Sequence, residues 1–104
     1  MKRSGPNLSF VLKYHPEVRN KDIIKLNADI KERIKKAIET RLINAPQQYG
    51  APLRKTLKGY WKLRVGDYRV VFKIQDTEIL ILGICHRKEV YKIVKVRIRN
   101  EDNT

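Results

Sequence analysis

The sequence is poor in the residues that build covalent cross-links and metal sites, and it has no long apolar run. It contains one cysteine and two histidines among 104 residues. A single cysteine excludes an internal disulfide and a metal site built from cysteines. No apolar run approaches the roughly 20 residues that a membrane-spanning helix needs. The first seven residues also lack the apolar core of a secretory signal. We therefore expect a cytoplasmic protein that needs no membrane, metal or other cofactor.

Acidic side chains are scarce as well. Lysine and arginine total 24 against 11 aspartates and glutamates, which gives a formal net charge of +13. Such a balance favours an anionic partner: a nucleic acid, an anionic membrane surface or an acidic protein. There is no glycine-rich phosphate loop and no carboxylate pair placed for two-metal chemistry. The length predicts one domain, which we assign to residues 8–99, with flexible tails at 1–7 and 100–104.

The order of the expected elements indicates the fold class. Apolar residues at helical spacing predict an amphipathic helix that is capped by Asn27 or Asp29 and ends near Asn44. A short helix should precede it after Pro16, and residues 46–52 should form a loop. Strands are expected at 8–14, 60–65, 68–74 and 78–84, and a last helix at 89–99. This order predicts an α+β domain: two N-terminal helices packed on one face of a small, mostly antiparallel twisted sheet, with a short C-terminal helix.

Cations alternate with apolar residues in the two central expected strands. In the first, Trp61 and Leu63 share one face while Lys62 and Arg64 share the other. Pairing with the next strand should bring Arg69 to the same side. We expect one concave site formed by these strands, the adjacent strand end and the start of the last helix. Its expected residues are Lys62, Arg64, Arg69, His86, Arg87 and Tyr91.

A basic face of this kind has two interpretations. It can be a solvated surface that only aids solubility. Arginine forks and aromatic planes, however, are what RNA phosphates and unstacked bases use, so we favour nucleic-acid contact. Histidine is the side chain whose ordinary pKa lies nearest neutral pH, so His86 is a candidate acid or base for attack of an RNA 2′-hydroxyl on the adjacent phosphate. A structural or merely binding role for His86 is equally compatible with the sequence. His15 is expected at a helix start, and Cys85 as a small apolar residue.

Three segments together resemble the RelE/ParE superfamily of toxins from type II toxin–antitoxin modules. They are Trp61-Lys-Leu-Arg64, Asp67-Tyr-Arg-Val-Val-Phe72 and His86-Arg-Lys-Glu-Val-Tyr91. The resemblance implies a RelE-like, microbial-ribonuclease-like fold and a metal-independent endoribonuclease that cleaves messenger RNA in the ribosome. It also implies an acidic antitoxin that folds onto the toxin as an added helix or strand, a hetero-oligomer of the two, and contact with DNA only through the antitoxin.

The resemblance also implies residue roles. Arg69 is similar to the family's phosphate-stabilising arginine, Arg87 to its C-terminal arginine, and Tyr91 to the aromatic that stacks on or orients the substrate base. His86 is similar to the histidine that serves as acid or base in several branches. These four residues are the expected catalytic set. The expected RNA-binding residues are Lys58, Tyr60, Lys62, Arg64 and Lys88.

Two positions depart from the pattern of some RelE toxins. These toxins carry lysine where this chain has Tyr60 and arginine where it has Cys85. The departures shift weight from an all-basic mechanism onto His86. Two alternative functions therefore stay open: a ParE-like inhibitor of DNA gyrase, and a catalytically degenerate toxin that acts only by binding its antitoxin.

Overall fold

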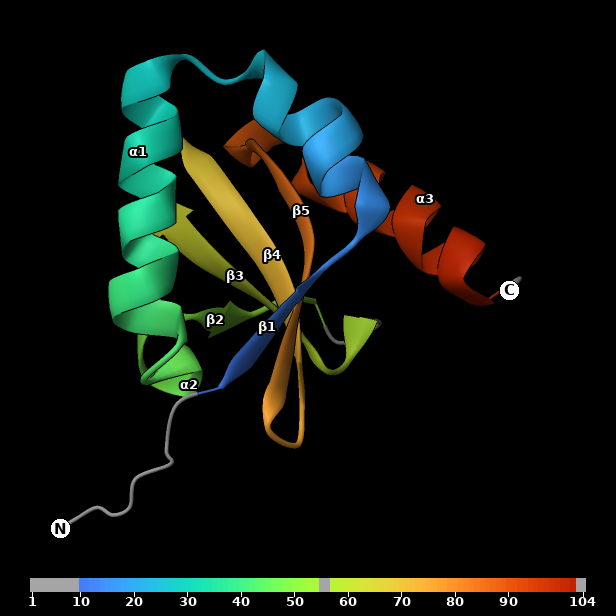
Figure 1. Ribbon diagram of the computed structural model, residues 1–104. Helices are drawn as coiled ribbons and strands as arrows, with labels where there is room; N and C mark the ends of the chain where they lie inside the picture. The colour runs from blue at the N-terminus through green and yellow to red at the C-terminus, as the bar shows by residue number, and fades with distance from the viewer. Residues whose placement is uncertain (1–9, 55–56, 103–104) are drawn as a thin grey trace, which may run out of the picture.

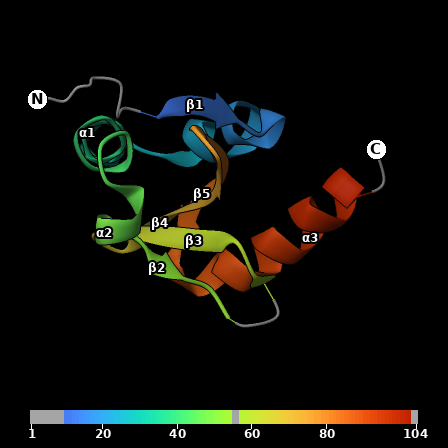
Figure 2. The same cartoon turned by 90° about the horizontal axis from the view of Figure 1, so that it is seen from below.

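The computed structural model describes residues 10–54 and 57–102, and it shows a five-stranded mixed sheet with helices on both faces (Figures 1 and 2). The strands follow the order β1-β5-β4-β3-β2; only β1 and β5 pair in parallel. The strand bounds are β1 Val11–Tyr14, β2 Ala51–Pro52, β3 Tyr60–Val65, β4 Tyr68–Gln75 and β5 Glu78–His86. The helical bounds are η1 Val18–Asp22, η2 Ile23–Lys25, α1 Ala28–Ala37, η3 Ile38–Leu42, α2 Pro46–Tyr49, η5 Arg87–Glu89 and α3 Val90–Asp102. The predicted α+β class and mostly antiparallel sheet are confirmed.

The amphipathic helix forms as the sequence predicts. The Asn27 side chain accepts a hydrogen bond from the Ile30 backbone N–H at 2.9 Å, which caps the first turn of α1. The helix continues through the π-helical turn η3, and Ala45 lies between it and Pro46. Its apolar stripe is buried against the sheet, as expected. The buried residues of this stripe are Ile34, Ala37, Ile38 and Leu42.

Other local expectations need correction. The segment that was expected to be a loop, 46–52, contains the single turn α2 and the short strand β2. Pro46 suits the first helical position, where its missing N–H costs nothing. In the short helical region before α1, the apolar side chain of Ile24 is 71% exposed. The expected tail 1–7, with Leu8 and Ser9 of the first strand, lies outside the described residues. Helix α3 extends to Asp102, past the expected end at residue 99.

The sequence suggested that the helices share one face of the sheet, but in the structure they pack on both faces. One core lies between α1, the N-terminal turns and the sheet, and contains Leu63, Val70 and Phe72. The other lies between the sheet and α3, and contains Val71 and Val94. Figure 2 shows α1 and α3 on opposite sides of β3 and β4. Among the described residues, no helix is long and apolar enough to span a membrane.

A buried ion pair ties the N-terminal turns to α3. Two guanidinium nitrogens of Arg97 donate to the two carboxylate oxygens of Asp22, at 2.6 and 2.8 Å. The same carboxylate accepts from the Ile84 backbone N–H at 2.8 Å, and Arg97 also donates to the Leu82 carbonyl at 3.0 Å. Hydrogen bonding to Asp22 raises the pKa of Arg97, against the opposing effect of burial. The pair therefore provides hydrogen-bond partners for the backbone groups at the edge of β5 beyond the end of β1, namely the Ile84 N–H and the Leu82 carbonyl.

We predict that Arg97→Met strongly destabilises the fold, because it leaves the Asp22 carboxylate buried without its counter-charge. Removing one partner of a buried pair typically costs about 3–5 kcal/mol. Urea unfolding followed by circular dichroism measures the effect. The control is Lys13→Gln, which removes an exposed ion pair with Glu78 (3.6 Å) and should leave the midpoint nearly unchanged. Equal midpoints for Arg97→Met and the wild type would contradict the prediction.

Candidate functional site

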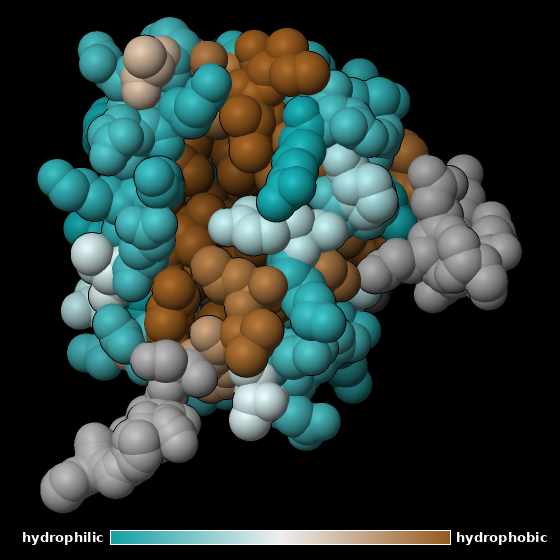
Figure 3. Space-filling view, in the orientation of Figure 1, coloured by the Kyte–Doolittle hydropathy of each residue, from teal (hydrophilic) through white to brown (hydrophobic). Residues whose placement is uncertain are grey.

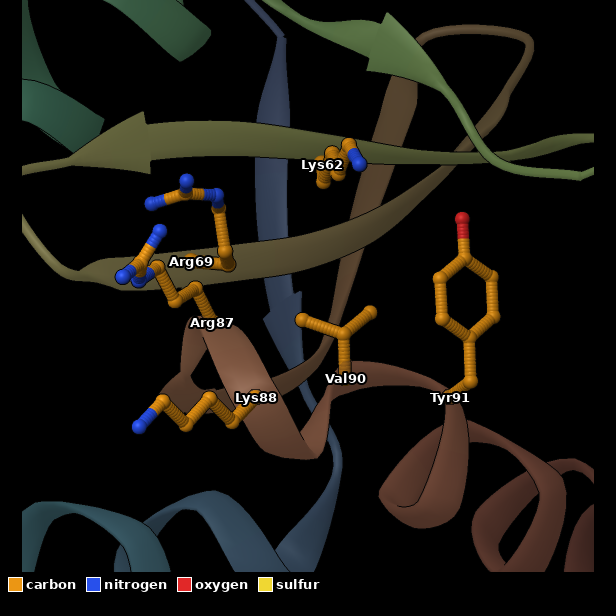
Figure 4. A pocket seen from close by; sticks show the side chains of 6 residues that line it. All are labelled: Lys62, Arg69, Arg87, Lys88, Val90 and Tyr91. Atoms are coloured by element: carbon orange, nitrogen blue, oxygen red, sulfur yellow. The ribbon is translucent and has the colours of Figure 1, made fainter.

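The largest group of expected site residues surrounds one cavity on the α3 side of the sheet (Figure 4). Its volume is about 420 Å³. Residues from β3, β4, η5 and the first turn of α3 line it. They are Lys62, Arg69, Arg87, Lys88, Val90 and Tyr91. We call this cavity the first cationic pocket. Among the described residues that line it there are four cations, one tyrosine, and no carboxylate or histidine.

Strand alternation explains how the two strands supply these cations. Arg64 pairs with Arg69 across β3 and β4, and Lys62 pairs with Val71, which belongs to the core under α3. Directly opposed residues of an antiparallel pair point to the same face. Lys62 and Arg69 therefore share the α3 face and line one cavity, while the apolar residues next to them in the strands enter the other core. Arg64, near the end of β3, instead lines a cavity at the α1 side of the β3–β4 turn. For Lys62 and Arg69, the predicted alternation is found.

The β3–β4 turn holds Arg69 in place. Its guanidinium donates to the carbonyl oxygens of Gly66 at 3.0 Å and Tyr68 at 2.9 Å. The turn also anchors Arg87, whose backbone N–H donates to the Asp67 carbonyl at 2.8 Å. The side chains of Arg87 and Asp67 are 4.0 Å apart and exposed, so this ion pair contributes little stability. Two guanidinium groups thus lie at one end of the pocket, and the Tyr91 ring lies at the other (Figure 4).

Arg54 is a neighbour of the pocket that the sequence did not single out. Its guanidinium carbon lies 3.9 Å from the centroid of the Tyr91 ring, within cation–π range. The Lys62 ammonium is 6.0 Å from the same centroid. The only sequence signal for Arg54 was its place in a basic segment, which applies equally to its neighbours. Its contact with Tyr91 depends on how the chain before β3 packs against α3.

His86 does not lie in this pocket, contrary to the expected concave site. It pairs with Tyr68 across β4 and β5, and their rings meet edge-to-face at 5.7 Å between centroids. Its Nδ1 accepts a hydrogen bond from the Lys88 backbone N–H at 3.2 Å, as a cap for the following turn. Tyr68 packs on the α1-side core, so the His86 side chain faces away from Lys62 and Arg69.

A β-bulge is the physical reason for this placement. Val71 pairs with Gly83 but Phe72 pairs with Ile81, so Leu82 is an extra residue in β5. A shift of one residue turns every following side chain to the opposite face. Without the bulge, strict alternation from Leu80 would aim His86 at the α3 face. With it, Cys85 faces α3 instead.

Three expected RNA-binding residues also lie away from the first cationic pocket. Tyr60 is buried in the core under α3, and the Lys73 ammonium lies 5.3 Å from its ring centroid. Arg64 is exposed and lines a different cavity, at the α1 side of the β3–β4 turn. Lys58 is exposed before β3 and does not line the pocket. The expected set therefore divides between the pocket, the core and the surrounding surface.

The remaining reactive side chains have structural surroundings. His15 Nδ1 accepts from the Glu17 backbone N–H at 3.1 Å, as expected of a residue at a helix start. Cys85 is buried, and this burial together with the nearby Asp22 carboxylate raises the pKa of its thiol to about 12. A thiol held neutral is a poor nucleophile. In the described part of the chain, no group of three or more histidines, cysteines and carboxylates is arranged to hold a metal ion.

Comparisons with known proteins agree on one family. The family model described as "ParE toxin of type II toxin-antitoxin system, parDE" matches residues 12–91. Toxin RelE of Mycobacterium tuberculosis is 40% identical over 60 residues, covering 56% of this chain and 62% of that toxin. Toxin RelG of the same organism is 38% identical over 53 residues, covering 49% and 61%. The chain therefore matches about three-fifths of the length of these two relatives.

A solved structure extends the likeness to nearly a whole protein. The crystal structure of the toxin–antitoxin complex RelBE2 from M. tuberculosis contains a chain that is 30% identical to this one, with a TM-score of 0.69. The match covers 76% of this chain and 99% of that chain. The fold described above is therefore that of RelE toxins.

The burial of Cys85 leads to a prediction about its reactivity. At about pH 9, near the pKa of an ordinary thiol, iodoacetamide should label the folded protein far more slowly than the protein in guanidinium chloride. Mass spectrometry of quenched samples measures both rates. Because the pKa of Cys85 is higher in the folded protein than in the unfolded chain, the neutral thiol favours folding, and this contribution to the free energy of unfolding is complete below about pH 8.5. It is lost as the pH rises towards 12. Equal labelling rates would show that the thiol is accessible.

Proposed function

Because the chain belongs to the RelE/ParE superfamily of toxins from type II toxin–antitoxin systems, we propose that it is a metal-independent endoribonuclease that cleaves messenger RNA in the ribosome. The observation that carries the proposal is the first cationic pocket. It gathers Arg69, whose guanidinium is held by two hydrogen bonds, with Arg87, two lysines and a tyrosine around a space large enough for a phosphate and a base. Cations that are fixed before the substrate binds can stabilise developing charge without reorganising.

The proposed reaction is an attack by the ribose 2′-oxygen on the adjacent phosphorus. A 2′-oxygen–phosphorus bond forms, and the bond from phosphorus to the 5′-oxygen breaks. Arg69 and Arg87 hold the extra negative charge on the phosphate, and Lys62 adds a third cation. One proton leaves the 2′-hydroxyl, and one is delivered to the 5′-oxygen. Within the pocket, the ammonium of Lys62 or Lys88 can give a proton to the 5′-oxygen, and the Tyr91 hydroxyl can relay the proton of the 2′-hydroxyl to solvent.

We predict that Arg69→Gln lowers the rate of message cleavage about 10²–10³-fold, because it removes an anchored charge donor from the transition state. The assay is primer extension on a message translated in a purified system. Lys95→Ala is the matched control, since it removes one exposed cation of α3 outside the pocket. His86→Ala should reduce the rate much less than Arg69→Gln. Loss of cleavage in a folded His86→Ala variant would instead assign the acid or base role to His86.

A second candidate function is inhibition of DNA gyrase. The matching family model is that of ParE toxins, and this observation favours the alternative named above. A supercoiling assay with the same purified proteins separates the two functions. Gyrase inhibition without RNA cleavage would overturn the ribonuclease proposal. If the wild type shows neither activity but still binds its antitoxin, the degenerate-toxin alternative holds.

We also propose an acidic antitoxin as the partner, with ribosomal RNA and messenger RNA as the other ligands. An apolar groove of about 410 Å³ runs between α1, β1 and the N-terminal turns (Figure 3). Its apolar lining includes Leu12, Ile34 and Ile38, with the exposed cations Arg19, Lys31 and Lys35 and the carboxylate of Glu39 beside them. An amphipathic segment with acidic residues beside its apolar face fits this combination.

We predict that Lys31→Glu/Lys35→Glu weakens capture of the antitoxin encoded by the neighbouring gene, because it places like charges at the groove. Co-expression followed by affinity purification at moderate salt measures the complex. The control Lys92→Glu/Lys95→Glu makes the same charge change on exposed positions of α3. Equal recovery of both variants would place the antitoxin elsewhere. Failure of the wild type to co-purify with that product would remove the partner proposal.

A further inference from the structure

A second cationic cavity lies on the other side of the β3–β4 turn from the first. Its volume is about 290 Å³, and α1, η3 and the end of β3 enclose it. Four cations line it together with small or uncharged residues. The cations are Arg33, Lys36, Arg41 and Arg64, and the other lining residues are Ala37, Thr40, Val65 and Gly66. We call it the second cationic pocket. It plays no part in the reaction proposed above.

The cations of this cavity have no ion-pair partner within the described part of the chain. Among the described residues, no carboxylate lines the cavity. The carboxylate of Glu39 lines the apolar groove on the other side of the helix. The guanidinium carbon of Arg41 lies 5.8 Å from the centroid of the Tyr49 ring. Four like charges around one hollow repel each other, and a bound anion removes that cost.

Geometry connects the second pocket to the first. Gly66 lines the second pocket, and its carbonyl accepts the hydrogen bond from Arg69, which lines the first. A Cβ atom at Gly66 would lie 3.3 Å from a guanidinium nitrogen of Arg33, so Arg33 lies directly against the turn. Gly66 has a φ of +60°, which favours glycine and permits this close approach. Arg64 and Arg69 are paired across the two strands, one at each pocket. The turn is thus a narrow ridge with arginines on both sides.

We propose that the second cationic pocket binds a backbone phosphate of the same RNA whose reacting phosphate occupies the first pocket, so that the strand crosses the β3–β4 turn. This inference rests on the proposed function in that both sites serve one RNA. Arginine forks match phosphate oxygens, and a phosphate contact positions the strand without reading its bases. An acidic peptide can also satisfy positive charge. The shared turn and the paired arginines favour a ligand with a regular repeat of negative charges.

The experiment measures RNA binding as a function of salt. The probe is a short, labelled single-stranded RNA that carries 2′-O-methyl groups and cannot be cleaved by 2′-oxygen attack. Arg33→Ala/Lys36→Ala removes two exposed cations from the second pocket, and Lys92→Ala/Lys95→Ala removes two exposed cations of α3 as a matched control. Each neutralised phosphate on a single strand contributes about 0.7 to the slope of log affinity against log salt. We expect the first variant to lose about 0.7 from the slope, which corresponds to one phosphate, and the control to keep the wild-type slope.

Two further results make the test decisive. Arg33→Lys/Lys36→Arg keeps both charges and should keep the wild-type slope. If Arg33→Ala/Lys36→Ala binds RNA like the control, the second phosphate site does not exist, whether or not the wild type cleaves messages. If the slope falls but the wild type cleaves no message, the site stands and the ribonuclease proposal fails. Loss of antitoxin binding without a change in the RNA slope would assign the pocket to the protein partner and overturn the inference.

Discussion

The ion pair between Asp22 and Arg97 is the interaction on which the two-faced architecture depends. It joins the turns before α1 to helix α3 around the edge of β5, and it satisfies the Ile84 N–H and the Leu82 carbonyl where β1 no longer reaches. These groups lie at the β-bulge. Gly83 is the residue at which a Cβ would come within 2.9 Å of the Arg97 guanidinium. The ion pair therefore fits against the bulge because the residue there is a glycine, since a side chain at this position would meet the Arg97 guanidinium.

This arrangement decides what each face of the sheet presents. Because the bulge inverts the end of β5, His86 packs on Tyr68 at the α1 side, and Cys85 fills the position opposite Arg69. A small buried thiol there leaves space for the Arg69 guanidinium to turn back onto the Gly66 and Tyr68 carbonyls. Docking of α3 by Arg97 then sets Tyr91 beside Lys62 and Arg54. The first cationic pocket is thus a consequence of how the helix is held.

Features that depend on local periodicity were predictable, and those that depend on long-range register were not. Alternation in β3 and β4 correctly placed Lys62 and Arg69 on one face, and helical spacing correctly identified the buried side of α1. The face of His86 depends on a single extra residue in β5, which an almost wholly apolar strand cannot reveal by alternation. The position of Arg54 over Tyr91 depends on the path of the chain before β3. The packing of α3 on the opposite face depends on a carboxylate and a guanidinium that are 75 residues apart in the sequence.

The absence of histidine from the first cationic pocket limits the chemistry that its lining residues can perform. In the proposed reaction, four cations around one cavity stabilise a doubly charged phosphorane well, yet an ammonium or a guanidinium has hydrogen-bond donors only and cannot accept a proton. In this proposed reaction, deprotonation of the 2′-hydroxyl is therefore assisted mainly by electrostatics, with the proton leaving through Tyr91 or solvent. Arg54 already covers one face of the Tyr91 ring. In the proposed complex with RNA, a substrate base therefore has to stack on the opposite face of the Tyr91 ring or displace Arg54. In the second case, the released guanidinium adds one more cation to the phosphate.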